Sequence, residues 1–216
     1  MTISDTEYLV LVDKDDNPIG SEEKVKCHLP NGKLHRAFTI LLFDKDNKFL
    51  LTQRSKTKML WPGDWDGTVA SHPRRAETYV SSAERRLPEE IGISCKLDYL
   101  FKFKYHVPYK NIGSENEICG TLIGMVKDPS KIKLVKEEID DIKWVSLDEL
   151  LADIKKSPQI YCPWMILALY FLQESRTNVM PEHQSILDMW IRSDVKQILE
   201  KPLLFHFPDK NWELKA

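Results

Sequence analysis

The sequence of 216 residues predicts one mixed α/β domain with additional helices at its C-terminal end. Short apolar runs typical of strands recur from residue 7 to residue 145. A helical pattern interrupts them over 80–91, where apolar residues return near the 3.6-residue period and Gly92 follows as a helix cap. Further helical patterns come after the last strand. We expect a core at about 5–174 and a helical extension at 175–216, within a single domain spanning 1–216.

The expected elements follow from local signals along the chain. The expected strands are 7–12, a short one after the turn at 15–20, then 38–43, 48–53, 99–105, 121–126 and 144–145. The linker 44–47 predicts a hairpin between 38–43 and 48–53. Besides 80–91, helices are expected after a capping box at Ser146, from Pro163 to Gln173, and over 183–200. Pro88 lies inside the first helix, so we expect either a kink or a new turn there.

Composition excludes several classes of function. Charged residues make up 30% and hydrophobic residues 42% of the chain, as in an ordinary soluble globular protein. The net charge of −2 gives no bulk attraction to nucleic acid or to an anionic membrane. The most apolar segment, 164–172, is far shorter than the ~20 residues that span a bilayer. Four scattered cysteines without a C-x-x-C pair predict reduced thiols. With no signal peptide visible, a cytoplasmic location is expected.

Histidines and glutamates at three places are candidates for a metal site. His28 and His35 bracket a Pro-Asn-Gly turn, so a fold-back can bring them together, and His72 lies in the loop before the helix. Glu115 and Glu117 are two apart, so on a strand both carboxylates face the same side. This donor set suits Mn, Mg, Fe or Zn. From spacing alone, the alternative is that each histidine is an ordinary surface or core residue.

The stretch 66–93 resembles the signature of the Nudix superfamily, G-x5-E-x7-R-E-U-x-E-E-x-G-U. The matching positions are Glu77, Arg85, Leu87, Glu89, Glu90, Gly92 and Ile93. Two positions depart from it, because Ser71 replaces the first glycine and Arg86 replaces the first glutamate of the helix. The resemblance implies a Nudix-type α/β/α sandwich with a mixed sheet, here with additional C-terminal helices.

A closer resemblance, to type I isopentenyl-diphosphate isomerases, rests on several motifs taken together. They are Cys27-His28-Leu29, Gly32-x-Leu34-His35-Arg36-Ala37-Phe38, Gln53-Arg54-Ser55-x-x-Lys58, Trp61-Pro62-Gly63, Ser71-His72-Pro73, Arg85-Arg86-Leu87, Glu90-Ile91-Gly92-Ile93 and Glu115-Asn116-Glu117. They run in the family's order and spacing from about residue 5 to Trp164. The resemblance implies a prenyl diphosphate as the small-molecule partner, with no nucleic acid and no membrane. The sequence carries no signal of an oligomeric state.

The resemblance also implies roles for individual residues. A divalent ion (Mn, Mg or Zn) would be held by His28, His35, His72, Glu115 and Glu117, and a second Mg, travelling with the substrate diphosphate, by Glu90. The phosphate oxygens would be bound by Lys24, Arg54, Lys58 and Arg86. Trp164 would stabilise a carbocation with its aromatic face, or else simply pack in the core. Glu117, assisted by Tyr105, would give the proton in a 1,3 proton shift that converts isopentenyl diphosphate to dimethylallyl diphosphate.

Ala70 is the main departure from the isomerase pattern. The family places a cysteine there, on the opposite face of the substrate from Glu117, and alanine can neither give nor accept a proton. Three explanations are open: a deliberate Cys→Ala change, proton transfer by another group such as water, or ligand binding without isomerisation. Cys119 is expected to be a packed thiol, and Cys162 is a weak substitute. The alternatives to an isomerase are therefore a non-catalytic prenyl-diphosphate binder and a metal-dependent Nudix diphosphate hydrolase.

Overall fold

A mixed sheet is the frame of the protein, whose computed structural model describes residues 7–174, 178–192 and 194–215. Its strands are β1 (Tyr8–Val12), β2 (Pro18–Glu23), β3 (His35–Phe43), β4 (Phe49–Arg54), β5 (Trp65–Asp66), β6 (Val69–Ser71), β7 (Leu97–Tyr109), β8 (Gly113–Met125), β9 (Ile139–Val145) and β10 (Trp212–Lys215). The longest path is β10-β7-β8-β3-β1-β2, and β4 joins β3, β5 and β9. This arrangement confirms the expected mixed α/β class.

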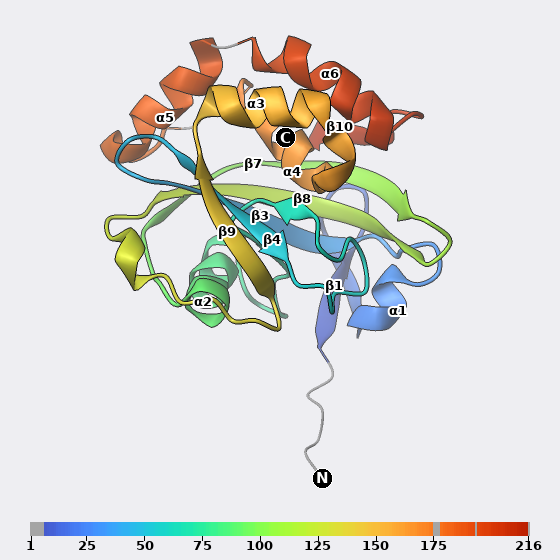
Figure 1. Ribbon diagram of the computed structural model, residues 1–216. Helices are drawn as coiled ribbons and strands as arrows, with labels where there is room; N and C mark the ends of the chain where they lie inside the picture. The colour runs from blue at the N-terminus through green and yellow to red at the C-terminus, as the bar shows by residue number, and fades with distance from the viewer. Residues whose placement is uncertain (1–6, 175–177, 193, 216) are drawn as a thin grey trace.

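Helices cover both faces of the sheet, as Figure 1 shows. They are α1 (Lys24–His28), α2 (Tyr79–Ile91), α3 (Leu147–Lys156), α4 (Pro163–Leu172), α5 (Pro181–Arg192) and α6 (Val195–His206), with single 3-10 turns at Pro129–Lys131 and Pro158–Ile160. Helices α3 to α6 gather on one face, and α2 packs on the other. Alternate residues of β3 serve the two cores: Leu41 packs with the C-terminal helices, and Leu42 packs with α2. In the described part of the chain no helix combines the length and apolarity needed to cross a membrane.

Two of the predicted helices follow directly from their end signals. Helix α2 begins after Thr78, whose side chain accepts a hydrogen bond from the Ser81 amide, and it ends at Gly92 with a left-handed φ of 72°. It continues through Pro88, which lies on the exposed side of the helix, so no new element starts at Glu89. Helix α4 begins with Pro163 and is buried on nearly every side, as its wholly apolar sequence predicts.

The predicted hairpin between 38–43 and 48–53 is wrong in its pairing. The strands β3 and β4 meet only at Phe43 and Phe49 and then diverge. Strand β3 runs instead parallel to β8 along its whole length, and β4 pairs with β9. The linker 44–47 does form a tight turn, with two amides bonded to the Asp44 carboxylate, so local turn chemistry was correctly predicted while the long-range pairing was not.

The other differences lie near the chain ends. The single helix expected over 183–200 is two helices, α5 and α6, between which residue 193 lies outside the described residues. The segment that ends at His28 forms the short helix α1, which was not predicted. The tail after residue 206, for which no element was expected, forms β10 and pairs antiparallel with β7. Strand β8 begins at Gly113, so it contains both Glu115 and Glu117 as well as the predicted strand 121–126.

Candidate active site

One row of side chains lies across three strands, and two of its members, Glu117 and Tyr105, line the main pocket. His35 on β3 lies opposite Glu117 on β8, and Glu117 lies opposite Tyr105 on β7. Residues paired in this way point to the same face of a sheet. The Tyr105 hydroxyl accordingly donates to Glu117 Oε2 at 2.5 Å, and His35 Nε2 lies 3.3 Å from Glu117 Oε1. All three side chains are buried.

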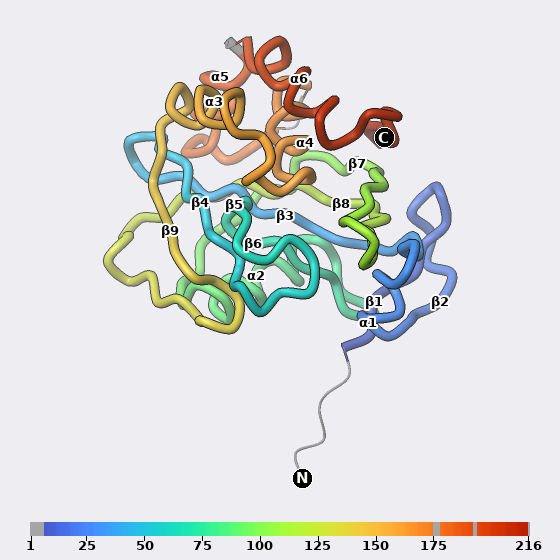
Figure 2. The backbone as a smooth tube through the Cα atoms, turned by 45° about the vertical axis from the view of Figure 1, so that its right-hand side comes forward, coloured from blue at the N-terminus to red at the C-terminus, as the bar shows by residue number. Residues whose placement is uncertain are grey.

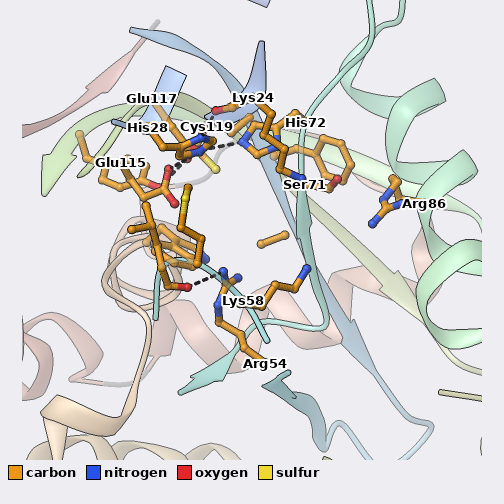
Figure 3. Close-up of a pocket in the computed structure, with 17 residues that line it drawn as sticks. Lys24, His28, Arg54, Lys58, Ser71, His72, Arg86, Glu115, Glu117 and Cys119 are labelled. Carbon is orange, nitrogen blue, oxygen red and sulfur yellow. Dashed lines mark hydrogen bonds and ion pairs between the residues drawn. The ribbon is translucent and has the colours of Figure 1, made fainter. Parts of the chain in front are cut away.

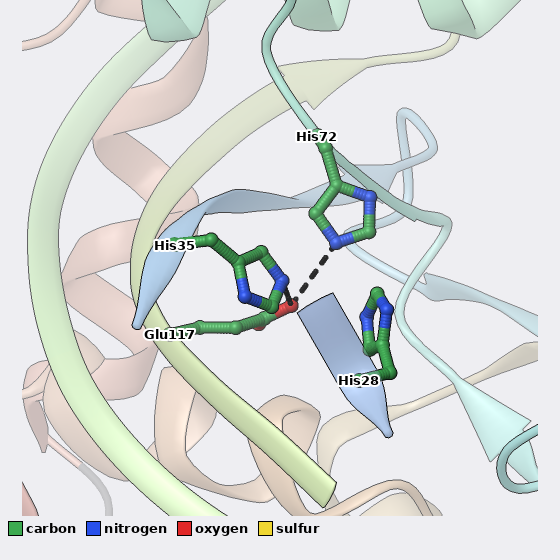
Figure 4. Close-up of side chains that lie close together, drawn as sticks. All are labelled: His28, His35, His72 and Glu117. Atoms are coloured by element: carbon green, nitrogen blue, oxygen red, sulfur yellow. Dashed lines mark hydrogen bonds and ion pairs between the residues drawn. The ribbon is translucent and has the colours of Figure 1, made fainter. Parts of the chain in front are cut away.

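Two further histidines reach this row from outside the sheet. His28 ends helix α1, and its ring centroid lies 4.9 Å from that of His35. His72 follows β6 and places its Nε2 3.2 Å from Glu117 Oε1. The fold-back around the Pro-Asn-Gly turn therefore does bring the two predicted histidines together. We call His28, His35, His72 and Glu117 the histidine cluster: each offers one ligand atom, and these atoms lie within 4.8 Å of one another (Figure 4).

Backbone carbonyls orient two of these rings. His28 Nδ1 contacts the Lys24 carbonyl oxygen at 2.6 Å, and His35 Nδ1 contacts that of Lys33 at 2.7 Å. A nitrogen that contacts a carbonyl must carry a proton, so in the neutral ring each Nε2 is an electron-pair donor that faces the centre. His35 Nε2 is buried without a hydrogen bond, although Glu117 is close. A buried, unbonded nitrogen directed at a carboxylate and two more imidazoles fits a divalent cation such as Mn²⁺ or Zn²⁺.

Glu115, predicted as a fifth ligand, lies just outside the four-atom group. Its Oε2 is 3.0 Å from His28 Nε2, and this buried oxygen makes no hydrogen bond of good geometry. In the absence of a metal, burial opposes protonation of His28, but the Glu115 carboxylate outweighs it and raises the pKa of His28 to about 9. For His72, burial and the neighbouring His35 hold the pKa well below its ordinary value. The histidines of the cluster therefore differ in how easily a metal ion would displace a proton from the ring.

Basic residues from a loop and from α2 line the pocket at a distance from the histidine cluster. Figure 3 shows Lys58 and Arg86 away from the histidines, with the cavity between them. Arg86 donates to Glu90 Oε1 at 2.6 Å and to Glu138 Oε1 at 3.0 Å, and Lys58 pairs with the other oxygen of Glu138. We call Lys58, Arg86, Glu90 and Glu138 the arginine cluster. Burial raises the pKa of Glu90 to about 7 despite the neighbouring Arg86.

Arg54 and Lys24, the other predicted phosphate ligands, both line the pocket but are already engaged. The Arg54 guanidinium donates to the carbonyl oxygens of Trp61 and Leu60 at 3.1 and 3.0 Å and to Asp66 Oδ2 at 3.2 Å. It also stacks on Trp164, with the guanidinium carbon 5.1 Å from the ring centroid. Lys24 Nζ forms an ion pair with Glu7 at 2.7 Å. In this structure Arg54 thus builds the pocket wall more than it offers free donors.

Trp164 and Ala70 define the rest of the cavity. The indole Nε1 of Trp164 donates to Asp66 at 2.8 Å, which fixes the ring beside Tyr105 at a centroid distance of 6.4 Å. Ala70 lies on β6 opposite Thr39 of β3 and exposes its methyl group to the pocket. Cys119 also lines the cavity, as a buried thiol whose pKa burial raises well above its ordinary value. Cys162 is buried and does not line it.

The sequence analysis did not predict two residues that position the side chains of the pocket, Asp66 and Glu138. Asp66 ends a strand of only two residues and holds both Arg54 and Trp164, a role that depends on contacts across 98 positions of chain. Glu138 lies in an acidic run with Glu137, Asp140 and Asp141, where composition gives no reason to choose one carboxylate over another. The predicted Glu90 does not line the main pocket but an adjoining small cavity, together with Ala70, Lys58 and Glu138.

Comparison with known proteins places this geometry in a family. Residues 33–165 match the NUDIX domain model. An isopentenyl-diphosphate Delta-isomerase of Haloarcula marismortui is 38% identical over 172 residues, covering 76% of this chain and 89% of that protein. A second one, from Photorhabdus laumondii, is 42% identical over 158 residues, covering 73% and 88%. The chain belongs to the isopentenyl-diphosphate isomerase family of Nudix proteins.

Solved structures agree with the fold of this isomerase-family chain. A Deinococcus radiodurans protein superposes with a TM-score of 0.61 at 18% identity, covering 75% of this chain and 97% of that one. A MutT Nudix hydrolase from Burkholderia pseudomallei gives a TM-score of 0.50 at 18% identity, covering 67% and 99%. At such identities the likeness concerns the fold alone. The residues His28 and Lys24 lie before the matched NUDIX range, so the isomerase-family site draws on segments outside that match.

Proposed function

We propose that this chain converts isopentenyl diphosphate to dimethylallyl diphosphate by a 1,3 proton shift. The observation that carries the proposal is the Tyr105–Glu117 hydrogen bond of 2.5 Å, located between the histidine cluster and the ring of Trp164. A buried acid pair beside an aromatic face is what protonation of an alkene requires, because the alkene is a very weak base and the product is a cation. The relatives named isopentenyl-diphosphate Delta-isomerase support the same substrate.

The Tyr105–Glu117 pair would deliver the first proton. Burial and the neighbouring Glu117 raise the pKa of Tyr105 well above its ordinary value, so the phenol keeps its proton until substrate arrives. The proton would pass through this pair to the terminal alkene carbon, leaving a tertiary cation under the face of Trp164. The pocket wall made by Trp164, Leu60 and Phe38 would keep bulk solvent away from that cation.

The second proton must leave the allylic carbon on the opposite face, where Ala70 lies. Its loss moves the double bond to the internal position and completes the shift. Ala70 carries no acid or base, so we propose that a water molecule beside its methyl group accepts this proton, at a lower rate than a cysteine would support. Because cysteine is one atom longer than alanine, the smaller side chain leaves room at that point of the cavity.

We propose that the histidine cluster and Glu115 hold a divalent ion, with Mn, Mg and Zn as candidates. Such an ion would lower the affinity of Glu117 for the proton that the Tyr105 hydroxyl shares with it, and so favour passage of that proton to the alkene. A second Mg would lie at Glu90 with the diphosphate, whose oxygens Lys58 and Arg86 would bind. Lys24 would contribute a further positive charge at the rim. The four free cysteines are consistent with a reducing, cytoplasmic location.

Diphosphate hydrolysis is the second candidate, and one observation favours it: Glu89 and Glu90 keep two glutamates of the Nudix signature. However, Arg86 stands in place of a third and donates to both of them, at 2.9 and 2.6 Å. The carboxylates that a hydrolase would use to hold metal are therefore partly neutralised. Binding without turnover is the third candidate and rests on Ala70.

The test is turnover of isopentenyl diphosphate, with Mg²⁺ and Mn²⁺ supplied, by this chain and by its Ala70→Cys variant. We expect slow isomerisation by the natural chain and a rate about 10²-fold higher in the variant, the usual contribution of one acid–base group. Equal rates would show that another group removes the proton. Activity of the variant alone would identify the natural chain as a binder. Release of phosphate without isomerisation would favour the hydrolase.

A further inference from the structure

Glu138 connects the two basic residues that are proposed to bind diphosphate. One carboxylate oxygen pairs with Lys58 Nζ, and the other accepts a hydrogen bond from an Arg86 terminal nitrogen at 3.0 Å. Lys58 belongs to the loop after β4, and Arg86 belongs to α2, so this single carboxylate bridges two separate walls of the cavity. It lies in the position that an oxygen of a bound anion would take between the two cations.

The backbone fixes the position of Glu138. Its carbonyl oxygen accepts a hydrogen bond from the Ser55 amide at 3.0 Å, beside the end of β4. Three residues earlier, the Val135 amide donates to the Glu90 carbonyl oxygen at 3.0 Å, which ties the same turn to the end of α2. Figure 2 shows this segment, just before β9, passing alongside α2. The fold therefore fixes the backbone of Glu138, and its side chain lines the small cavity that adjoins the main pocket.

The charges of the arginine cluster leave no excess positive charge for an anion. Arg86 donates to Glu89, Glu90 and Glu138, and Lys58 pairs with Glu138, so two cations face three carboxyl groups. Lys58 and Arg86 hold the pKa of Glu138 at about 2 in spite of its partial burial, so Glu138 stays ionised. A multiply charged diphosphate that enters without a cation meets a cluster that is already neutralised.

From this geometry we propose that Glu138 is a positioning residue that makes diphosphate binding depend on a divalent cation. It occupies Lys58 and Arg86 in the absence of ligand. A metal–diphosphate complex brings enough positive charge to be accepted beside Glu90 and Glu138, whereas the free diphosphate is repelled by the ionised Glu138 carboxylate. The inference rests on the proposed function only in placing the diphosphate at the arginine cluster.

Glu138 would make the site selective for anions that carry a divalent cation. Without Glu138, Lys58 and Arg86 would form an open cationic pair able to bind any small polyanion of suitable size. With Glu138 in place, phosphorylated metabolites that carry no divalent cation are excluded. The same carboxylate would also release the product, since loss of the metal would restore the ion pairs that compete with the diphosphate.

The experiment measures binding of inorganic pyrophosphate by isothermal titration calorimetry, first in EDTA and then with excess Mg²⁺. It compares the natural chain with Glu138→Gln and, as a matched control, with Glu137→Gln. Glu137 is the exposed neighbouring carboxylate on the same turn, so its replacement removes the same charge without touching the two cations. We expect Glu138→Gln to tighten metal-free binding by roughly tenfold, the effect of removing one charge at contact distance. The enhancement by Mg²⁺ should shrink accordingly.

Each outcome has a defined meaning. The natural chain and Glu137→Gln should both bind pyrophosphate poorly in EDTA and well with Mg²⁺. Unchanged metal dependence in Glu138→Gln would overturn the inference about Glu138 and leave the proposed isomerase intact. Failure of every variant to bind, even with Mg²⁺, would overturn the diphosphate site itself. If Glu138→Gln does not fold, Glu138→Asp replaces it, because the shorter acid keeps the charge but loses the bridge, and a smaller shift in the same direction is expected.

Discussion

The histidine cluster and the arginine cluster lie around the main pocket and the small cavity that adjoins it, but they are built in different ways. The histidine cluster is set on adjacent strands, where β3, β8 and β7 fix His35, Glu117 and Tyr105 by register. Two of its ring nitrogens, His35 Nε2 and His72 Nδ1, are buried without a hydrogen-bond partner. The arginine cluster joins a loop, a helix and a turn, and its members already satisfy one another by ion pairs. Four potential metal ligands thus lie close together in one cluster, whereas the charges of the other cluster are already paired. On the proposed function, the first cluster would serve the chemistry and the second would bind the substrate.

The largest effect is expected for Glu117→Gln, which we compare with Glu115→Gln. We expect Glu117→Gln to lower turnover by about 10²–10⁴-fold, because the amide cannot supply the proton shared with Tyr105. Glu115→Gln should mainly weaken metal affinity, since that side chain contacts His28 and does not touch Tyr105. Turnover and bound metal are measured together. Equal losses of turnover in the two variants at saturating metal would contradict the separate role of Glu117.

At the arginine cluster, Lys58→Ala should raise KM for isopentenyl diphosphate by about tenfold and change kcat little. The reason is that Lys58 lies far from the Tyr105–Glu117 pair, so its loss removes binding of the diphosphate in ground and transition states alike. The control is Lys56→Ala, an exposed lysine of the same loop. Steady-state rates at low and high salt provide the measurement. A fall in kcat with unchanged KM would place Lys58 in the chemical step instead.

The smallest expected effect is a pH dependence of stability in the metal-free protein. His28 has a folded pKa of about 9, above the ordinary value of 6.5. Protonated His28 therefore stabilises the fold fully below about pH 6.5, and this contribution is lost as the pH rises through about 9. We expect a loss of about 1 kcal/mol or more, seen as a fall in Tm of about 2–4 °C in EDTA. Thermal unfolding of His28→Gln should show no such fall.

Glu138 provides the contrast to that titration. Its pKa of about 2 keeps Glu138 ionised throughout the range in which His28 changes, so Glu138 should contribute no slope there. Glu90, whose pKa burial raises to about 7, should lower stability as the pH rises from about 4.5 through about 7. A stability curve of His28→Gln that still falls between about pH 7 and pH 9 would mean that a group other than His28 titrates in this window.

Local signals predicted the parts of the fold that local chemistry determines. The caps at Gly92 and Ser146, the proline start of α4 and the turn at 44–47 all appear where they were expected. Strand partners were not predictable in this way, because β3 pairs with a strand that begins some 70 residues later. Helix α1 was missed because five residues are too few for an apolar period to show.

The same division holds for the site. The residue types and motif order indicated His28, His35, His72 and Glu117, and the structure brings all four together. Arg54 was expected to bind phosphate, yet its guanidinium donates to the backbone carbonyls of Leu60 and Trp61. The sequence gives no sign of these contacts, because they depend on how the loop folds back. Glu138 could not be selected among adjacent acidic residues from the sequence. It is distinguished only by its position in the fold, which is set by backbone hydrogen bonds of its turn to Ser55 and to the end of α2.

Because the proposed ligands of the histidine cluster depend on strand register, metal loading would also report on the quality of folding. A slip of β8 by one residue would turn Glu117 to the opposite face and bring Asn116 or Ile118 in its place. The proposed ligands are drawn from positions 28 to 117, so a nascent chain that ends before Glu117 would lack the complete set. A bound metal would thus distinguish correctly threaded molecules from misaligned ones before any substrate is offered.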